Sequence, residues 1–275
     1  MRARTLRSGP VPPPSPPRVA LVTGVSRRAG IGFAVARRLL ADGLHVFVHG
    51  FPAHDDEQPW GADPAGTDGV LAAIAAPPDR LGHLECDLAD SDAPAVLVDA
   101  AIDRFGALDV VVANHARSSR ASLADLTAAE LDASWAVNAR ASLLLVQAYA
   151  ARHDDTRPDG RVVLFTSGQH LGDGMPDELP YAVSKGAIHQ MTRSLGDALA
   201  DRRITVNCVN PGPTDTGWAT PELDATVERA MPFGRWGTPD DVANLVAFLV
   251  SDEGGWITGQ VIDSEGGFRR SRMSP

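Results

Sequence analysis

The chain reads Val19-Ala-Leu-Val-Thr-Gly24-Val-Ser-Arg-Arg-Ala-Gly30-Ile-Gly32 and then continues into a helix-like segment. The first four residues are all apolar, which is typical of a strand buried on both faces. A glycine-rich turn between a strand and a helix N-terminus can bind an anion, because free N–H groups and the helix dipole point at the ligand. This stretch predicts a phosphate-binding turn, and the alternative is a tight turn without a ligand.

Short apolar runs alternate with helix-like segments along most of the chain. We expect strands at 19–22, 45–49, 84–87, 108–113, 161–166, 204–209 and 260–263. Helices are expected at 31–42, 93–105, 131–152, 181–201 and 239–251, with a loop and one weak helix (69–76) over 50–80. The alternation predicts an α/β fold, a single doubly wound Rossmann-type domain with a mostly parallel seven-stranded sheet and helices on both faces. Ligands of such a sheet bind beyond the carboxyl ends of its strands.

Composition limits the possible functions. The net charge of −10 argues against a general binder of nucleic acid or of anionic membranes. No apolar run approaches the roughly 18 residues of a membrane span. The eight histidines show no metal-binding spacing, so no metal is expected. Cys86 and Cys208 cannot form a disulfide framework and fit a reducing compartment, so we expect a cytoplasmic protein.

Three segments of different character follow one another. Residues 1–17 are rich in Pro and Arg and are expected to form a disordered extension. Residues 18–268 should form the dinucleotide-binding and catalytic domain, and residues 269–275 a C-terminal tail.

The chain has a single lysine, Lys185, which follows Tyr181 by four residues in a predicted helix. Residues four apart share a helical face, with Cβ atoms roughly 5–6 Å apart. A tyrosine has a pKa of about 10 and exchanges protons poorly at neutral pH. A nearby ammonium favours the phenolate, so we expect Lys185 to lower the pKa of Tyr181 and also to donate to a cofactor ribose. Ser167 ends the fifth strand, where its hydroxyl could bind a substrate carbonyl or be an ordinary strand-end serine.

The end of the second strand bears on the choice of cofactor. NAD-binding turns usually place a carboxylate there to hold the ribose hydroxyls. Here the strand ends in His49-Gly50-Phe51, and no carboxylate follows before Asp55. Arg27 and Arg28 in the turn could reach a 2′-phosphate, so NADP(H) is favoured, although NAD(H) is not excluded. The alternative for the two arginines is a solvated pair on a loop.

Taken together, these residues resemble the short-chain dehydrogenase/reductase family in its compact one-domain form. The likeness covers roughly 18–268 and is greatest to 3-oxoacyl-[acyl-carrier-protein] reductases. The resemblance implies four catalytic residues, Asn138, Ser167, Tyr181 and Lys185, with Asn138 holding a water that connects Lys185 to solvent. The predicted cofactor site comprises Thr23, Gly24, Ser26, Arg27, Arg28, Gly30, Ile31, Gly32, Asp87, Leu88, Asn114, Tyr181, Lys185, Pro211, Gly212, Thr214 and Thr216.

The sequence departs from the family pattern in two places. The turn is two residues longer than the family spacing, with Arg28 and Ala29 as the apparent insertion. Enoyl reductases of the same superfamily also carry a longer first turn, but they space the tyrosine and lysine more widely. His115 stands where the family tends to keep a small residue, and its side chain would narrow the pocket.

The resemblance implies an NADP(H)-dependent oxidoreductase that transfers hydride between nicotinamide and a carbonyl or secondary alcohol, with Tyr181 as general acid and base. The substrate would be a 3-oxoacyl thioester or a similar hydrophobic ketone, covered by a lid at 214–235. The alternatives are an enoyl-thioester reductase and a non-catalytic NADP(H)-sensing protein. The expected helix at 131–152 is more apolar than one buried face needs, which favours a homotetramer, or a dimer.

Overall fold

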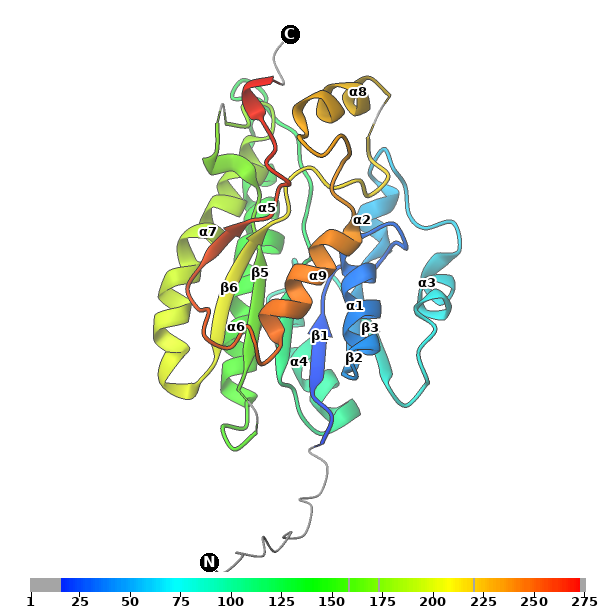
Figure 1. Ribbon diagram of the computed structural model, residues 1–275, viewed down its shortest axis with the longest axis vertical. Helices are drawn as coiled ribbons and strands as arrows, with labels where there is room; N and C mark the ends of the chain where they lie inside the picture. The colour runs from blue at the N-terminus through cyan, green and yellow to red at the C-terminus, as the bar shows by residue number, and fades with distance from the viewer. Residues whose placement is uncertain (1–15, 158, 173, 220, 273–275) are drawn as a thin grey trace, which may run out of the picture.

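The computed structural model describes residues 16–157, 159–172, 174–219 and 221–272. Within these residues seven strands run parallel in one sheet of order β3-β2-β1-β4-β5-β6-β7 (Figure 1). The predicted fold class is therefore confirmed. The strands are β1 (Val19–Val22), β2 (His45–Gly50), β3 (Leu81–Glu85), β4 (Val110–Ala113), β5 (Arg161–Phe165), β6 (Thr205–Asn210) and β7 (Val261–Asp263).

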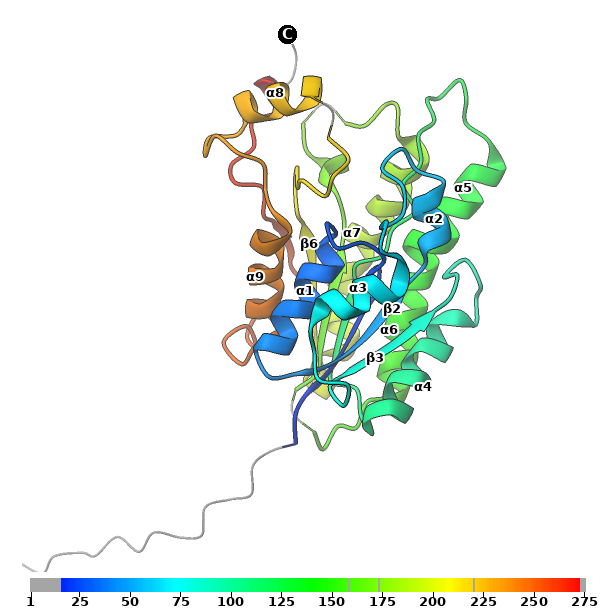
Figure 2. The ribbon, with the colours of Figure 1, turned by 90° about the vertical axis from the view of Figure 1, so that its right-hand side faces the viewer.

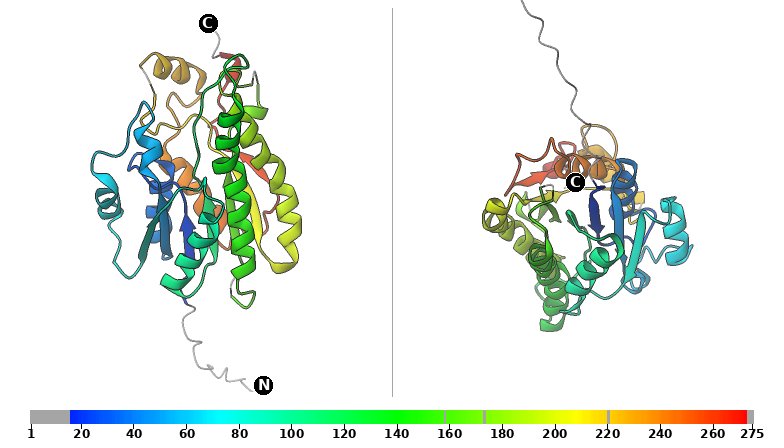
Figure 3. Two further views of the ribbon diagram at one scale, coloured as in Figure 1. Left: turned by 180° about the vertical axis from the view of Figure 1, so that it is seen from behind. Right: turned by 90° about the horizontal axis from the view of Figure 1, so that it is seen from below.

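Helices connect the strands and cover both faces of the sheet. They are α1 (Ile31–Ala41), α2 (Pro52–Asp56), α3 (Gly66–Ile74), α4 (Ala93–Phe105), α5 (Ala128–Ser134), α6 (Ala141–Arg152), α7 (Leu179–Leu199), α8 (Pro221–Ala230) and α9 (Pro239–Val250). Helices α1 and α9 pack together on one face, whereas α4, α6 and α7 cover the other (Figures 1 and 3). None of the described helices is both long enough and apolar enough to cross a bilayer.

The apolar run of β1 is explained by the two layers of helices. Side chains alternate along a strand, so Ala20 and Val22 join the core under α1 and α9. Val19 and Leu21 join the core under α4, α6 and α7. All four side chains are fully buried, as expected for a central parallel strand.

Two predicted elements differ from the structure. The third strand begins at Leu81 rather than at 84, because β3 pairs with β2 from Leu81 to Glu85. It is a half-exposed edge strand that contains Gly82 and His83. Because these residues interrupt the apolar run, the apolar pattern does not indicate the start of the strand. The helix expected at 131–152 is interrupted, since a π-helical segment, Trp135–Arg140, separates α5 from α6.

Helix α2 lies where only a loop is expected from the sequence, α8 lies within the predicted lid, and α3 replaces the weak helix placed at 69–76. The disordered extension predicted for 1–17 lies outside the described residues, except for Pro16 and Pro17. Within the predicted tail, Arg270–Arg272 form a short 3-10 turn, and the last three residues lie outside the described part. The predicted domain boundaries remain predictions.

A buried ion pair fixes the amino-terminal edge of the sheet. The Asp109 carboxylate is fully buried and accepts hydrogen bonds from the Nε and Nη2 atoms of Arg157, at 2.8 and 2.9 Å. It also accepts one from the backbone N–H of Val19 at 2.8 Å. The Tyr149 hydroxyl donates to the backbone oxygen of Asp109. This cluster lies at the opposite end of the strands from the crevice described next.

Candidate active site

A crevice of about 1410 Å³ opens at the carboxyl ends of the strands. The strand order reverses between β1 and β4, and ligands of open parallel sheets bind at such a switch point. Helix α8 and the C-terminal segment lie beyond this end of the sheet (Figure 2). The loops after six successive strands contribute lining residues, among them Gly24, Phe51, Asp87, Asn114, Ser167 and Pro211.

The glycine-rich turn between β1 and α1 packs directly against the loop after β4. Gly24 has a positive φ of 74°, and a Cβ there would lie 2.9 Å from the Asn114 Nδ2 atom and from the His115 Cα atom. A Cβ on Gly32 would lie 2.5 Å from the Gly24 oxygen. Asn114 holds the turn by donating to the backbone oxygens of Thr23 and Gly24, at 3.0 and 3.2 Å. Only glycine fits these two positions, which leaves the backbone open to a phosphate.

The two arginines of the turn have different surroundings. Arg28 does not line the crevice, because Asp63 binds its guanidinium at 2.7 Å. Arg27 lines the crevice, where its Nε atom lies 3.0 Å from Asp55 and its guanidinium lies over the Trp60 ring at 5.4 Å. Of the two cations proposed for a 2′-phosphate, Arg27 therefore lines the crevice and Arg28 does not.

His49 is the last but one residue of β2, and its side chain is buried and neutral. Its Nδ1 atom accepts from the backbone N–H of Gly24 at 3.3 Å, and its Nε2 atom contacts the Cys86 oxygen at 2.9 Å. Burial lowers the pKa of His49 to about 4. The position that carries an acid in many NAD-binding turns thus holds an uncharged ring, and Asp55 in the same crevice is paired with Arg27.

His115 is also buried, and its ring takes part in the packing behind the turn. The Nδ1 atom lies 2.7 Å from the Thr23 hydroxyl, and the Nε2 atom lies 2.9 Å from the Val137 oxygen. Burial lowers the pKa of His115 to about 3, so the ring is neutral at physiological pH. His115 lines the crevice, and its predicted narrowing of the pocket remains a prediction.

Tyr181 and Lys185 lie in the first turns of α7, beside the end of β5. The Lys185 Nζ atom donates to the Phe165 oxygen at 2.9 Å and lies 5.7 Å from the centre of the Tyr181 ring. The Thr166 hydroxyl donates to the backbone oxygen of Lys185, which fixes α7 against β5. Tyr181, Lys185 and Ser167 all line the crevice, so three of the four predicted catalytic side chains come together.

Burial dominates the electrostatics of this group. It raises the pKa of Tyr181 to about 12, and a hydrogen bond with the Ser167 side chain partly counteracts it. Burial also lowers the pKa of Lys185 to about 8. The prediction that Lys185 lowers the pKa of Tyr181 is therefore not confirmed, because burial outweighs the ammonium and Ser167 is the group that favours the phenolate.

The Asn138 side chain is fully buried in the π-helical segment and does not line the crevice. Its Oδ1 atom accepts from the Arg117 N–H at 2.7 Å, and its Nδ2 atom donates to the Arg117 oxygen and to the Ser184 hydroxyl. Asn138 thereby ties the loop after β4 to α7. Its predicted role in holding a water remains a prediction.

Most of the predicted cofactor residues line the crevice: Gly24, Ser26, Arg27, Gly30, Ile31, Asp87, Leu88, Asn114, Tyr181, Lys185, Pro211, Gly212, Thr214 and Thr216. Three others do not line it. Thr23 and Gly32 support the turn from behind, and Arg28 is bound by Asp63.

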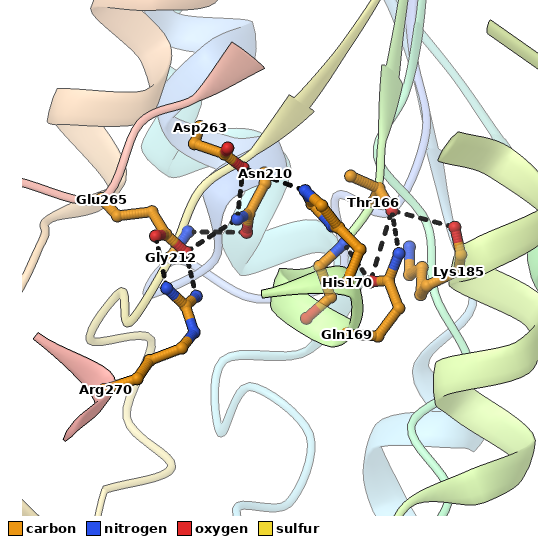
Figure 4. Close-up of polar contacts among 10 residues, drawn as sticks. Thr166, Gln169, His170, Lys185, Asn210, Gly212, Asp263, Glu265 and Arg270 are labelled. Atoms are coloured by element: carbon orange, nitrogen blue, oxygen red, sulfur yellow. Dashed lines mark hydrogen bonds and ion pairs between the residues drawn. The ribbon is translucent and has the colours of Figure 1, made fainter. Parts of the chain in front are cut away.

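Sequence reasoning missed several lining residues. Trp60 lies in the segment taken for a loop, and Arg270 lies in the segment taken for a tail. Nothing in their local sequence marks Trp60 or Arg270 as facing the crevice. Arg270 is held by Glu265, which in turn accepts from Asn210 (Figure 4).

Comparisons with known proteins agree with this geometry. A family model described as Enoyl-(Acyl carrier protein) reductase matches residues 24–269. The Uncharacterized oxidoreductase YjdA of Bacillus subtilis (strain 168) is 41% identical over 92% of this chain and 97% of its own.

Two solved structures are similar over nearly the whole chain. A short chain dehydrogenase from Burkholderia cenocepacia J2315, in complex with NADP, has a TM-score of 0.78 and 35% identity, covering 91% of this chain and 97% of its own. The promiscuous reductase LugOII catalyzes keto-reduction at C1 during lugdunomycin biosynthesis. Its structure has a TM-score of 0.79 and 35% identity, covering 92% of this chain and 97% of its own.

Proposed function

Because this chain belongs to the short-chain dehydrogenase/reductase family, we propose that it is an NADP(H)-dependent ketoreductase with Tyr181 as its general acid. Its substrate would be a hydrophobic ketone or a 3-oxoacyl thioester. One observation carries the proposal: Ser167, Tyr181 and Lys185 line one crevice together with the glycine-rich turn, and the Lys185 Nζ atom lies 5.7 Å from the centre of the Tyr181 ring.

The crevice fits a bound NADP(H). Side chains at Gly24 and Gly32 would collide with backbone atoms, so the turn presents bare backbone to a pyrophosphate. Arg27 would donate to the 2′-phosphate, and Pro211, Gly212 and Thr214 would contact the nicotinamide. The Burkholderia structure is in complex with NADP, which supports this choice over NAD. When bound, NADPH supplies the hydride.

The protein residues would bind the carbonyl and supply the proton. Ser167 and Tyr181 would both donate hydrogen bonds to the carbonyl oxygen. With a pKa of about 12, Tyr181 is protonated at neutral pH and so is in the form needed to give up a proton during reduction. With a pKa of about 8, Lys185 is mostly charged at pH 7, and its ammonium would stabilise the phenolate that remains.

Enoyl-thioester reduction is the second candidate, because the matching family model carries that description. The spacing of Tyr181 and Lys185 within one helical turn favours ketone reduction instead. The keto-reduction named for LugOII gives independent support. A cofactor-sensing protein would need the turn but neither Tyr181 nor Lys185.

Oxidation of NADPH and NADH, followed by absorbance, tests the proposal against acetoacetyl thioesters, quinones, cyclic ketones and a 2-enoyl thioester. We expect NADPH oxidation with at least one ketone and little with the enoyl compound. Turnover of the enoyl thioester alone would support the enoyl reductase. NADPH binding without any turnover would support the sensor.

We also propose that the protein assembles as a homotetramer in the cytoplasm. Trp135, Leu143 and Val183 are 49%, 43% and 58% exposed on the π-helical segment, α6 and α7. Large apolar side chains exposed on neighbouring helices favour a contact between subunits. Light scattering after size exclusion measures the mass directly, and a monomer at micromolar concentration would contradict the assembly. Cys86 and Cys208 are free thiols, in keeping with a reducing compartment.

A further inference from the structure

Arg270 brings a cation into the wall of the crevice from the C-terminal segment. Its side chain passes close to Gly168 and Gly172, in the loop that follows Ser167. A Cβ on Gly168 would collide with the Arg270 Nη2 atom, and a Cβ on Gly172 would lie 2.8 Å from the Arg270 Cδ atom. The guanidinium therefore lies beside the loop that carries Ser167, at the substrate end of the crevice.

The guanidinium is held in one orientation. Its Nη1 atom donates to the Glu265 Oε2 atom at 2.7 Å, and its Nη2 atom donates to the Oε1 atom. Glu265 is itself positioned by Asn210, whose Nδ2 atom donates to it at 2.7 Å (Figure 4). The Glu265 side chain is 9% exposed, so it cannot swing freely into solvent. A donor held in this way is preorganised for a ligand.

The guanidinium has donors to spare. It has five N–H groups, and within the described residues it donates only to Glu265. The Arg270 side chain is 22% exposed. Apolar residues also line this crevice, among them Leu171, Met175, Trp218 and Phe268. A polar group among apolar neighbours gives a pocket its specificity.

Glu265 determines which kind of oxygen can accept a hydrogen bond from the guanidinium. The ion pair is neutral overall, so it does not attract a carboxylate from a distance. A carboxylate at Arg270 would also lie near the Glu265 carboxylate, and like charges repel strongly where water is scarce. A hydroxyl or carbonyl oxygen accepts a hydrogen bond without that penalty.

We propose that Arg270 determines substrate specificity by donating to a second, uncharged oxygen of the substrate, a hydroxyl or carbonyl apart from the one reduced. Glu265 orients the guanidinium and excludes carboxylates. The inference rests on the proposed ketone reduction and adds the substrate class: hydrophobic ketones with a second neutral oxygen.

The test compares kcat/KM for 1-tetralone, its hydroxyl-bearing positional isomers and the corresponding carboxylic acids. For the wild type, we expect the best hydroxyl isomer to exceed 1-tetralone by about 10-fold or more, typical of a hydrogen bond to a charged group. In Arg270→Met this ratio should fall towards one. In Glu265→Gln the ratio for the best carboxylic acid should rise by about 10-fold, because the cation is no longer neutralised.

Arg269→Met is the matched control, since it removes the same charge from the neighbouring exposed residue. Its ratios should equal those of the wild type. Arg270→Lys keeps the positive charge but replaces the guanidinium by an ammonium, and it should show an intermediate ratio. An intermediate ratio would separate loss of the hydrogen bond from misfolding of the methionine variant.

Three outcomes would overturn the inference alone: an unchanged ratio in Arg270→Met, an equal loss with every ketone, or a wild-type preference for carboxylic acids. Failure of every ketone, including those tested above, to oxidise NADPH would instead refute the proposed function, and the inference with it.

Discussion

The ammonium of Lys185 lies 5.7 Å from the centre of the Tyr181 ring, and its nitrogen donates to the backbone oxygen of Phe165. The amine is therefore close enough to stabilise a phenolate but does not bind the phenol in this arrangement. Burial raises the pKa of Tyr181 to about 12 and lowers that of Lys185 to about 8, so at neutral pH Tyr181 is a neutral phenol and Lys185 is mostly an ammonium. This state is ready to donate a proton to a carbonyl.

Replacement of Tyr181 by Phe should abolish proton donation without closing the crevice. Loss of a general acid typically costs about 10²- to 10⁴-fold in rate, and we expect kcat for ketone reduction to fall by at least that much. The affinity for NADPH, measured by fluorescence titration, should stay within a few-fold of the wild type. Near-normal turnover would refute the assignment of Tyr181.

The rate of ketone reduction should fall as the pH rises through about 8. Lys185 loses its proton there, because its folded pKa lies below the ordinary 10.5, whereas Tyr181 keeps its proton up to about pH 12. Without the ammonium, the phenolate left by proton transfer is less stable. A pH profile of kcat checks this. In Lys185→Met the remaining activity should lack the step near pH 8, and a step that persists unchanged would assign it to another group.

Arg27 and Arg28 provide a matched pair for testing the choice of cofactor. Arg27→Ala should weaken NADPH binding by about 10- to 100-fold, typical of a lost hydrogen bond to a charged group, with a smaller effect on NADH. Arg28→Ala should change neither affinity much, because Asp63 holds Arg28 away from the crevice. Dissociation constants of NADPH and NADH, measured by fluorescence titration for each variant, test this difference between Arg27 and Arg28. Equal effects of the two substitutions would show that Arg28 leaves Asp63 to bind the cofactor.

The buried histidines should make the protein less stable in mild acid. The folded state keeps His49 and His115 neutral, with pKa values of about 4 and about 3, whereas the unfolded chain protonates them near pH 6.5. The unfolded state therefore binds more protons below pH 6.5, and stability falls as the pH falls. Between pH 7.5 and 5, each histidine should cost about 2 kcal/mol.

Urea unfolding at both pH values measures this loss. His115→Gln removes one of the two titrating groups. The loss of unfolding free energy between pH 7.5 and 5 should therefore be about 2 kcal/mol smaller in this variant than in the wild type. The same loss in wild type and variant would exclude His115 as a cause.

Arg157→Met should destabilise the fold without reaching the crevice. It leaves the fully buried Asp109 carboxylate without its cation, which typically costs about 3 kcal/mol in the free energy of unfolding. Arg152→Met removes an exposed ion pair with Asp99 and should cost less than about 1 kcal/mol. Chemical denaturation separates the two, and equal losses would show that Asp109 is stabilised by its other hydrogen bonds.

The parts of the fold that could be predicted are those set by local sequence. The first strand, the turn and the start of the first helix were placed correctly, because Val19–Val22 is wholly apolar and Gly30 precedes Ile31. The edge strand begins three residues before its predicted start, since none of its residues is fully buried and Gly82 weakens its apolar pattern. The π-helical segment Trp135–Arg140 contains the buried Asn138, which is hydrogen bonded to Arg117 and Ser184, and no periodicity of the sequence indicates these distant contacts.

The parts of the site that could not be predicted depend on contacts between distant residues. Asp63 captures Arg28 from 35 positions away, and nothing near either residue indicates the pairing. Arg270 reaches the Ser167 loop only because Gly168 and Gly172 leave room for it. Helical spacing gives the distance from Tyr181 to Lys185 but not the loss of water around the phenol, and this loss raises the pKa that the spacing alone predicts to be lowered.

Lys185 is the single lysine of the chain, and its side chain is only 2% exposed. The protein therefore presents no lysine on its surface to acylating reagents or to amine-directed cross-linkers. Chemical labelling of a lysine in this protein would report directly on access of the reagent to the floor of the crevice.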